Sequence, residues 1–402
     1  MAKPLLMLSS NEIEHIGFIL TPVFSSLALS KYSTNLLTDF LFLVVPQYLS
    51  ILCPSVMPLM IIFFVLIICA NCLFDKTNKK IESRIVFDIV RFVIIAQTTI
   101  CILLCDFKFW HKRLGKNDYF GVGLMDLGVA FFIFNGALLS SVVKNQKRFT
   151  SSAILVSLGL IRLYAIRIFN LDVNPAEYGT HWNFYFTLFS VQVLFFILNS
   201  KYNFILGTLI CVSYEIWLMF YYPIIFSEDR HNFLFANKEG LISLVPYLGS
   251  YLILNHLGKD VLSKDSKKAQ TKCVKIFIVC SILHFVSKLY SEPSRRLSNL
   301  GYMSWILAIL SFSLAFMHLC SKHLSQCSGK MALVKLCSKG MLDIFLVSNL
   351  CILLAKLCFN LEKMSFASGN LLFVLYLILN LLLVPKFGSA INKKSIKDTK
   401  VN

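Results

Sequence analysis

The stretch DFKFWHKRLGKNDYFGVGLMDLGVAFFIFN, residues 106–135, identifies the chain as a membrane protein. An apolar segment of helical length ends at Asp106, a basic loop follows, and a second apolar segment carries Asp126 near its start. A charged side chain at membrane depth costs several kcal/mol unless it is paired or lines a wet cavity. We therefore interpret the stretch as two membrane spans joined by a loop whose charges have a function.

The composition extends this interpretation to the whole chain. Of the 402 residues, 57% are hydrophobic and 36 are phenylalanine, which is more apolar surface than one aqueous core can hide. The charge-free run 40–74 is too long for one helix of roughly 20 residues, and Pro54 and Pro58 divide it into two expected spans. The sequence predicts an all-α polytopic membrane protein of about thirteen transmembrane helices. Their expected centres lie near Leu20, Val44, Phe64, Ile95, Phe131, Leu158, Phe189, Leu209, Pro246, Val279, Leu310, Val347 and Leu377.

The formal net charge of +18 would suggest a nucleic-acid partner if the basic residues did not fall into alternate loops. The positive-inside rule assigns the basic set of loops to the cytosol and the set poorer in Lys and Arg to the lumen. We therefore expect no nucleic-acid partner, a lumenal N-terminus and a cytosolic C-terminus. The basic set comprises residues 75–84, 144–148, 259–275, 322–339 and the tail from Lys386.

No Gly-, Ser- or Pro-rich linker, low-complexity tract or clear internal repeat divides the sequence, so residues 1–402 are expected to form one transmembrane domain. An active site must then be built from span interiors and short loops. That favours a lipid or lipid-like substrate, although a small transported solute would suit the same architecture. The 13 cysteines are scattered, and the one CxxC, formed by Cys69 and Cys72, has no second pair, so we expect no metal site.

Five polar clusters fall on the side assigned to the lumen. Unrelated loop residues would be divided between the two faces, so the shared side predicts a functional site. The clusters are residues 106–116, Asp126 with Asn135, EYGTHWNF (177–184), FANKEG (235–240) and EPSRRLSNLGYMSW (292–305).

The first cluster supplies the expected catalytic residues. In the loop 106–120 four basic residues outnumber two aspartates, so the loop departs from the charge rule and an anionic partner, phosphate first, is expected. A merely solvated loop is the alternative. Asp106, partly desolvated at the end of a span, is the expected proton acceptor, and Lys116 is its expected charged partner.

The other clusters supply expected substrate contacts. His181 and Asn183 open a span beside Trp182, and an interfacial anchor is the alternative role for this segment. Arg295 and Arg296 precede a span and would either grip a phosphate or extend to lipid headgroups. The full set of expected contacts is Asp126, Asn135, Arg162, His181, Trp182, Asn183, Asn237, Arg295 and Arg296.

Several reaction types lack their sequence signatures. There is no GxSxG elbow, Walker loop or HExxH pair, which disfavours nucleophilic-serine and metal hydrolysis. Direct attack of a bound hydroxyl on an activated acyl group needs only a base, an anion-binding surface and a tunnel for the acyl chain. Phe-rich spans can form such a tunnel.

Four segments resemble the inositol acyltransferases of glycosylphosphatidylinositol-anchor synthesis, the PIG-W family. The resemblance implies thirteen spans in the endoplasmic reticulum membrane, with the shared segments and the active site facing the lumen. It also implies transfer of a fatty acyl group, usually palmitoyl from palmitoyl-coenzyme A, to an inositol hydroxyl of glucosaminyl-phosphatidylinositol, with no cofactor besides this co-substrate. The segments are GLMDLGVAFFIFNGALLSS (123–141), EYGTHWNFYFTL (177–188), FANKEGLISL (235–244) and EPSRRLSNLGYMSWIL (292–307).

The resemblance also implies a catalytic Asp and Lys ten residues apart in the loop after the fourth span, a spacing that Asp106 and Lys116 match. Asp106 would take the inositol proton, and Lys116 would stabilise the oxyanion or the departing thiolate. Two other classes of protein stay open on spacing alone. One is a multi-pass solute transporter that binds its solute at intramembrane charges, although the related halves of such a protein are not apparent; the other is a non-enzymatic scaffold.

Overall fold

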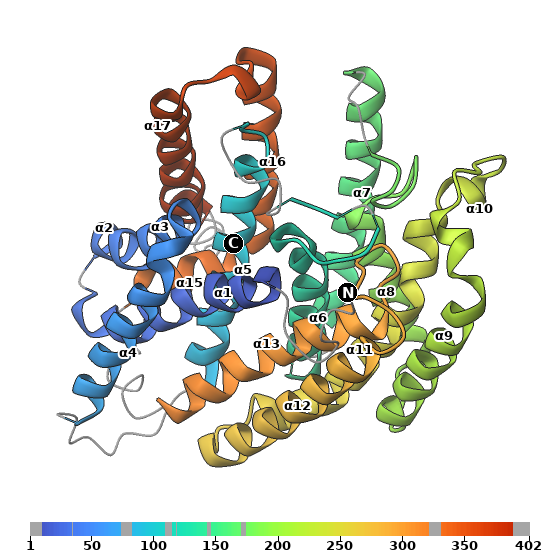
Figure 1. Ribbon diagram of the computed structural model, residues 1–402, viewed down its shortest axis with the longest axis horizontal. Helices are drawn as coiled ribbons and strands as arrows, with labels where there is room; N and C mark the ends of the chain where they lie inside the picture. Colours follow the sequence, from blue (N-terminus) through green and yellow to red (C-terminus); the bar gives the residue numbers. More distant parts are fainter. Residues whose placement is uncertain are drawn as a thin grey trace, which may run out of the picture.

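A computed structural model describes residues 10–33, 35–73, 83–108, 115–117, 119–142, 146–169, 174–320 and 331–388. Over these ranges the regular structure is helical, apart from one isolated bridge between Gly121 and Ser294. The predicted fold class, an all-α polytopic membrane protein, is confirmed. Figure 1 shows the helices along the chain.

The elements, in chain order, are α1 (Ser10–Leu29), η1 (Ser30–Tyr32), α2 (Leu36–Asp39), η2 (Phe40–Val44), α3 (Val45–Leu52), η3 (Pro54–Val56), α4 (Met57–Leu73), α5 (Ser83–Leu104), η5 (Leu124–Asp126), α6 (Leu127–Val142), α7 (Gln146–Ile168), α8 (Phe184–Leu198), α9 (Asn203–Phe226), α10 (Phe233–Ala236), α11 (Lys238–Val261), α12 (Ser266–Ser287), α13 (Leu300–Leu319), α15 (Ala332–Lys339), α16 (Met341–Cys358), η6 (Leu361–Lys363), α17 (Phe366–Leu377) and η7 (Ile378–Leu383). The segments η2 and η7 are π-helical, and the other η segments are 3₁₀ helices.

Ten helices in the described ranges are long and apolar enough to cross a membrane, and two shorter apolar helices, 36–52 and α8, accompany them. All thirteen expected centres lie in helices. The centre near Leu158 falls in α7, which is 23 residues long and is not among these twelve helices. The predicted division of the run 40–74 is also found. The chain leaves the helical conformation at Cys53, and Pro54 opens a new turn, because a proline cannot donate to the preceding turn.

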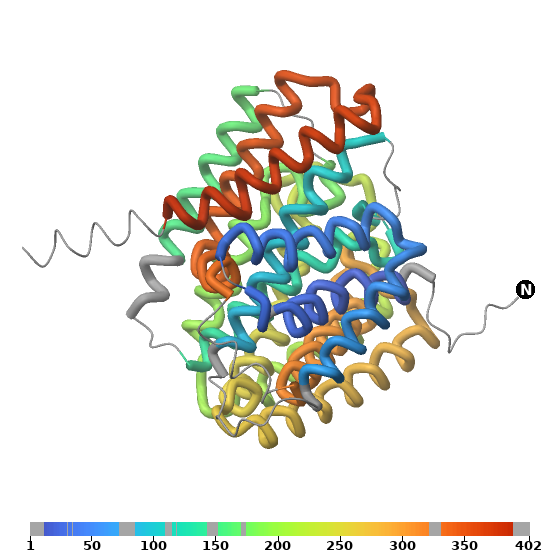
Figure 2. Tube along the Cα trace, turned by 90° about the vertical axis from the view of Figure 1, so that its left-hand side faces the viewer, coloured from blue at the N-terminus to red at the C-terminus, as the bar shows by residue number. Residues whose placement is uncertain are grey.

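Inner and outer helices differ in burial. In the span windows of α1, α5 and α13, 78–83% of residues are buried, whereas the windows of α9, α12 and α16 are 17–22% buried. Figure 1 accordingly shows α1 and α5 in the middle of the molecule and α9 and α12 at its rim. The outer helices expose residues such as Phe220 and Leu354, which lipid tails would cover. Figure 2 shows α16 and α17 crossing the top of the molecule, where both contact α5.

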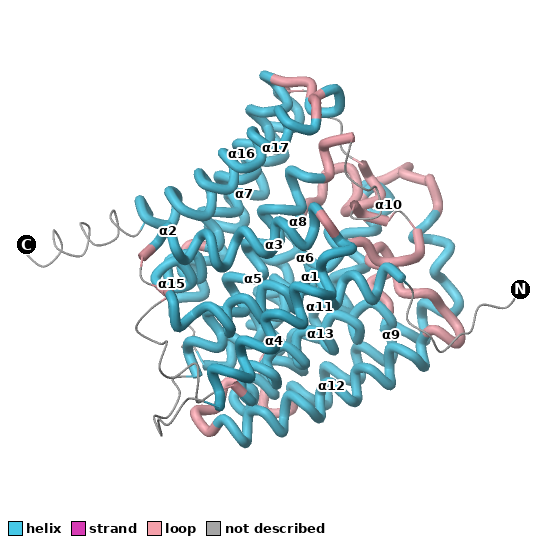
Figure 3. Tube along the Cα trace, turned by 60° about the vertical axis from the view of Figure 1, so that its left-hand side comes forward, coloured by secondary structure: helices cyan, strands magenta, loops and turns pink. Residues whose placement is uncertain are grey.

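The loops that carry the polar clusters lie together. In Figure 3 the connections around α10 gather at the right-hand side of the molecule. Three backbone contacts join them: Gly121 N–H donates to Pro293, Thr180 N–H donates to Ala236, and Gly240 N–H donates to Tyr178. The fold therefore brings four segments that are distant in sequence to one end of the helix bundle.

Candidate active site

Lys116 and Glu177 form an ion pair at the centre of the joined loops. Lys116 Nζ lies 2.7 Å from Glu177 Oε1, and both side chains are partly exposed. Burial would raise the pKa of Glu177, but the charges of Lys116 and Arg295 outweigh it and hold the pKa below its usual range. Glu177 is therefore a carboxylate at neutral pH, and Lys116 faces a fixed negative charge.

A buried carboxylate holds the loop that presents Lys116. The Oδ2 atom of Asp126 accepts the backbone N–H groups of Asn117 at 3.1 Å and Gly123 at 2.8 Å, and its Oδ1 atom is 2.7 Å from Arg295 Nε. Gly123 must be glycine here, since a Cβ would lie 1.7 Å from the carbonyl oxygen of Gly115. The side chain of Asp126 is fully buried and binds protein groups, so it positions Lys116 instead of making the substrate contact expected from the sequence.

Arg295 joins this loop to Glu177. Its Nη1 atom donates to the Glu177 carbonyl at 3.4 Å, and its guanidinium lies 5.8 Å from the ring centre of Tyr178. Burial disfavours the charged form, yet Asp126, Tyr178 and Glu177 together raise the pKa of Arg295. Arg295 is turned inward and paired, so the alternative that it extends to lipid headgroups is wrong.

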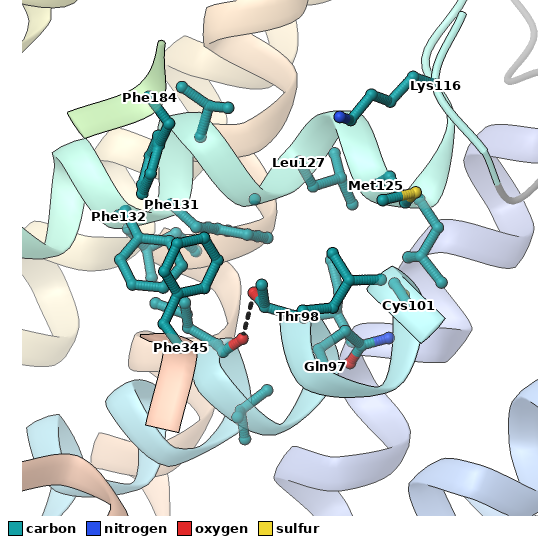
Figure 4. A pocket seen from close by; sticks show the side chains of 18 of the residues that line it. Gln97, Thr98, Cys101, Lys116, Met125, Leu127, Phe131, Phe132, Phe184 and Phe345 are labelled. Carbon is teal, nitrogen blue, oxygen red and sulfur yellow. Dashed lines mark hydrogen bonds between the residues drawn. The ribbon is translucent and has the colours of Figure 1, made fainter. Parts of the chain in front are cut away.

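An apolar cavity of about 160 Å³ opens beside Lys116. Figure 4 shows Lys116 at one edge with its amine directed over the cavity. Gln97, on the α5 wall, is 9% exposed, and neither its amide oxygen nor its nitrogen has a hydrogen-bond partner in the described structure. Burying an amide without hydrogen bonds costs free energy. We therefore expect a polar group of a ligand, or a water, to bind Gln97 here. Four aromatic rings line the other side of the cavity in Figure 4: Phe131, Phe132, Phe184 and Phe345.

A smaller groove of about 40 Å³ adjoins the cavity. The two share Arg162, Glu177 and Tyr178 as lining residues. The segment that follows α7 forms much of the groove, together with His181 and Trp182. An apolar chamber and a polar groove thus meet at one charged wall, which suits a ligand with an acyl chain and a polar head.

Asp106 lies in a different pocket from Lys116. Its Oδ1 atom is 2.9 Å from Lys356 Nζ, at the end of α16, and both residues line a polar pocket of about 560 Å³. The expected pairing of Asp106 with Lys116 is therefore wrong, because α16 ends beside α5 and supplies a closer cation. Cys101 and Ile102, in the last turn of α5, line the cavity, and Cys105 and Asp106, which follow this helix, line the Asp106 pocket. Both pockets therefore border the same end of α5.

Of the expected contacts around His181, some hold the backbone of this turn and others line the groove. Asn183 caps α8 by accepting the N–H groups of Tyr185 and Phe186. Asn237 is buried, and its side-chain oxygen accepts the N–H groups of His181 and Trp182 at 2.8 and 2.9 Å. It therefore fixes this turn. Of the expected contacts in this turn, His181 and Trp182 line the groove with part of their surface exposed.

Arg296 and Asn135, like Asp126, Asn237 and Arg295, line none of the three pockets. Arg296 is buried, with Nη2 2.9 Å from Glu239 Oε1 and 3.0 Å from the Ile225 carbonyl oxygen, so it joins α9 to α11 and does not reach toward lipid. Asn135 is buried in α6, 3.9 Å from Met341 Sδ. Neither lines the pockets that contain Asp106, Lys116 or His181, so both hold the fold.

Sequence reasoning missed three residues that the structure makes important: Gln97, Glu177 and Glu239. Glu177 and Glu239 lie inside the quoted motifs, but a motif does not say which cation its carboxylate meets. Glu239 is held by Arg230 at 2.6 Å and by Arg296. Gln97 had a usable signal, because it is a lone amide within the apolar run of α5.

The fold and the site define a class: a polytopic helical membrane protein in which a charged wall separates an apolar cavity from a polar groove. The chain belongs to the GWT1 family, whose model matches residues 6–385. The predicted membership of the PIG-W family is thereby confirmed.

Curated relatives agree with the family. The chain is 29% identical over 294 residues to GPI-anchored wall transfer protein 1 of Kluyveromyces lactis, covering 68% of this chain and 66% of the relative. It is 28% identical to glucosaminyl-phosphatidylinositol-acyltransferase PIGW of Bos taurus, covering 70% and 66%. It is 30% identical to phosphatidylinositol-glycan biosynthesis class W protein of Dictyostelium discoideum, covering 56% and 57%. The aligned part thus spans less than two thirds of each relative.

Proposed function

We propose that this protein is a membrane O-acyltransferase of GPI-anchor biosynthesis. It would transfer a fatty acyl group, palmitoyl, from its coenzyme A thioester to an inositol hydroxyl of glucosaminyl-phosphatidylinositol. The name of the bovine relative supports the reaction class. The observation that carries the proposal is the position of Lys116, a cation at the mouth of an apolar cavity.

The acyl donor would place its chain in this cavity and its thioester carbonyl beside Lys116. One N–H of the amine pairs with Glu177, which leaves the other two to stabilise negative charge on the carbonyl oxygen or the leaving sulfur. Glu177 fixes the direction of the Lys116 amine. The cavity wall of aromatic rings excludes water, which strengthens this electrostatic stabilisation.

The acceptor would place its inositol ring beside Asp106. The inositol oxygen attacks the thioester carbon, an ester C–O bond forms, and the C–S bond breaks. Asp106 accepts the hydroxyl proton and returns it to the thiolate, so the products are acyl-inositol and free coenzyme A thiol. Separate pockets for donor and acceptor explain why Asp106 and Lys116 have different ion-pair partners.

We further propose that the whole chain is one transmembrane domain in the endoplasmic reticulum, with the site facing the lumen. The convergence of the five clusters' loops supports a common face. A glycosylation acceptor inserted in a flexible segment after Asn360 should be modified, whereas the same segment after Lys201 should stay unmodified. The opposite pattern would reverse the orientation.

A microsomal assay tests the reaction. Microsomes from cells that lack this activity and express the chain receive labelled palmitoyl-coenzyme A and glucosaminyl-phosphatidylinositol. The expected product is an acylated lipid that resists phosphatidylinositol-specific phospholipase C. Transport of either compound without any acylated product would favour a transporter instead.

A further inference from the structure

Arg162 differs from the other buried or half-buried arginines of this end of the bundle. Arg230 and Arg296 are held by Glu239, and Arg295 is held by Asp126. Arg162 forms no ion pair with a carboxylate in the described part of the chain, although it lines both the cavity and the groove. The charge of Arg162 contributes to lowering the pKa of Glu177, but that carboxylate already pairs with Lys116, so the place of Arg162 in a pocket points to an additional anionic ligand.

The groove around Arg162 has the chemistry of an anion site. It adds a second arginine, Arg167, five residues further along α7, and this side chain likewise has no carboxylate partner among the described residues. Thr180 and His181 add a hydroxyl and an imidazole that are 2.8 Å apart. Among the described residues that line the groove, Glu177 is the single carboxylate, and it already pairs with Lys116. The lining is therefore net positive.

The outer face of α7 shows where the ligand comes from. Four of its apolar side chains are 46–70% exposed: Leu160, Ile161, Tyr164 and Ile168. In a membrane protein such a face borders lipid. Leu163 and Ile166 line the groove on the same helix, so the groove lies beside the lipid phase. A phosphate that arrives within the membrane meets Arg162 and Arg167 directly.

We infer that Arg162 and Arg167 form a subsite for the phosphodiester of an inositol phospholipid that enters laterally past α7. Two arginines can hold such a group through charge-assisted, bidentate hydrogen bonds. The groove of about 40 Å³ exceeds the roughly 10–15 Å³ that a single water requires by the same measure, so it has room for phosphate oxygens. The inference rests on the proposed function for the identity of the acceptor, but the binding itself does not require catalysis.

The test measures equilibrium binding to the purified full-length protein in detergent. The probes are dioctanoyl-phosphatidylinositol, dioctanoylglycerol, which lacks the phosphate, and coenzyme A. Arg162→Gln should weaken binding of the phospholipid about tenfold or more, because a hydrogen bond to a charged group contributes roughly 1.5–3 kcal/mol. Binding of dioctanoylglycerol and of coenzyme A should not change, and Arg162→Lys should restore part of the affinity.

Two controls keep the outcome clear. Lys201→Gln removes an equal charge from the loop between α8 and α9 and should leave phospholipid binding unchanged. If Arg162→Gln does not fold, Arg167→Gln, at an exposed position, carries the same expectation.

Unchanged phospholipid binding in a folded variant would overturn the inference. So would a loss of coenzyme A binding alone, since the phosphate would then belong to the acyl donor. Arginine-dependent phospholipid binding without any acyl transfer would keep the subsite and reject the proposed function, so the two failures are distinguishable.

Discussion

Lys116 Nζ and Glu177 Oε1 lie 2.7 Å apart and join the loop after α5 to the loop after α7. This contact places a cation where the apolar cavity meets the polar groove. Asp126 and Arg295 hold the two loops from the buried side. The proposed function depends on this arrangement, because it gives Lys116 a fixed position and an apolar cavity as its neighbour.

A double-mutant cycle tests the role of this pair in catalysis. Lys116→Ala should lower the acyl-transfer rate at least about 100-fold, the usual loss when one oxyanion donor is removed. Glu177→Gln should lower the acyl-transfer rate less, by about tenfold, since Lys116 remains. The double variant should be no slower than Lys116→Ala, because Glu177 acts through Lys116. Additive losses would show that Glu177 has an independent role, and Lys201→Ala serves as the charge control.

Acid should weaken the same contact. The folded pKa of Glu177 lies below its ordinary value of 4.5, so its ion pair contributes stability above that pH and loses it as the pH falls through the folded pKa. The Tm difference between wild type and Glu177→Gln should be constant near neutral pH and shrink below about pH 4.5. Thermal unfolding across this pH range measures it. A difference that grows on acidification would show that the carboxyl is not held charged in the fold.

Asp126 should matter for folding more than for substrate contact. Asp126→Asn leaves Arg295 buried without a counter-charge, and breaking such a pair costs about 3–5 kcal/mol. Asp260 pairs with Lys268 and Lys272 at an exposed site, so Asp260→Asn should lower the free energy of unfolding by less than about 1 kcal/mol. Thermal unfolding of both variants in detergent is the measurement. Equal shifts would mean that the buried pair adds little to stability.

The cavity should set which acyl chains are used. Gly128 lines it, and a Cβ added there would meet only Thr98 Oγ1 at 4.0 Å, so larger side chains can enter without a backbone clash. The series Gly128→Ala, Gly128→Val and Gly128→Leu should favour progressively shorter acyl donors. Gly136→Ala, on the α11 side of the same helix, should leave the preference unchanged. A general loss of rate at every chain length would instead indicate a packing defect.

The fold was largely predictable because apolar segments of helical length and loop charges are local properties of the sequence. The grouping of the clusters followed from the alternation of basic loops. The partners in the ion pairs were not predictable in the same way. Asp106 pairs with Lys356 of α16, and Lys116 pairs with Glu177 of a loop that is distant in sequence. Asn237 appeared as a substrate contact because an isolated amide in a motif does not reveal that it will bind backbone N–H groups.

The most direct measurement is a single-turnover assay with purified protein in liposomes that contain glucosaminyl-phosphatidylinositol. Palmitoyl-coenzyme A is added to wild type, Asp106→Asn and Lys116→Ala, each checked for normal folding by its unfolding temperature. The account predicts inositol-acylated product from wild type and a rate at least about 100-fold lower in both variants. Equal rates in all three folded proteins, or no product from wild type, would contradict it.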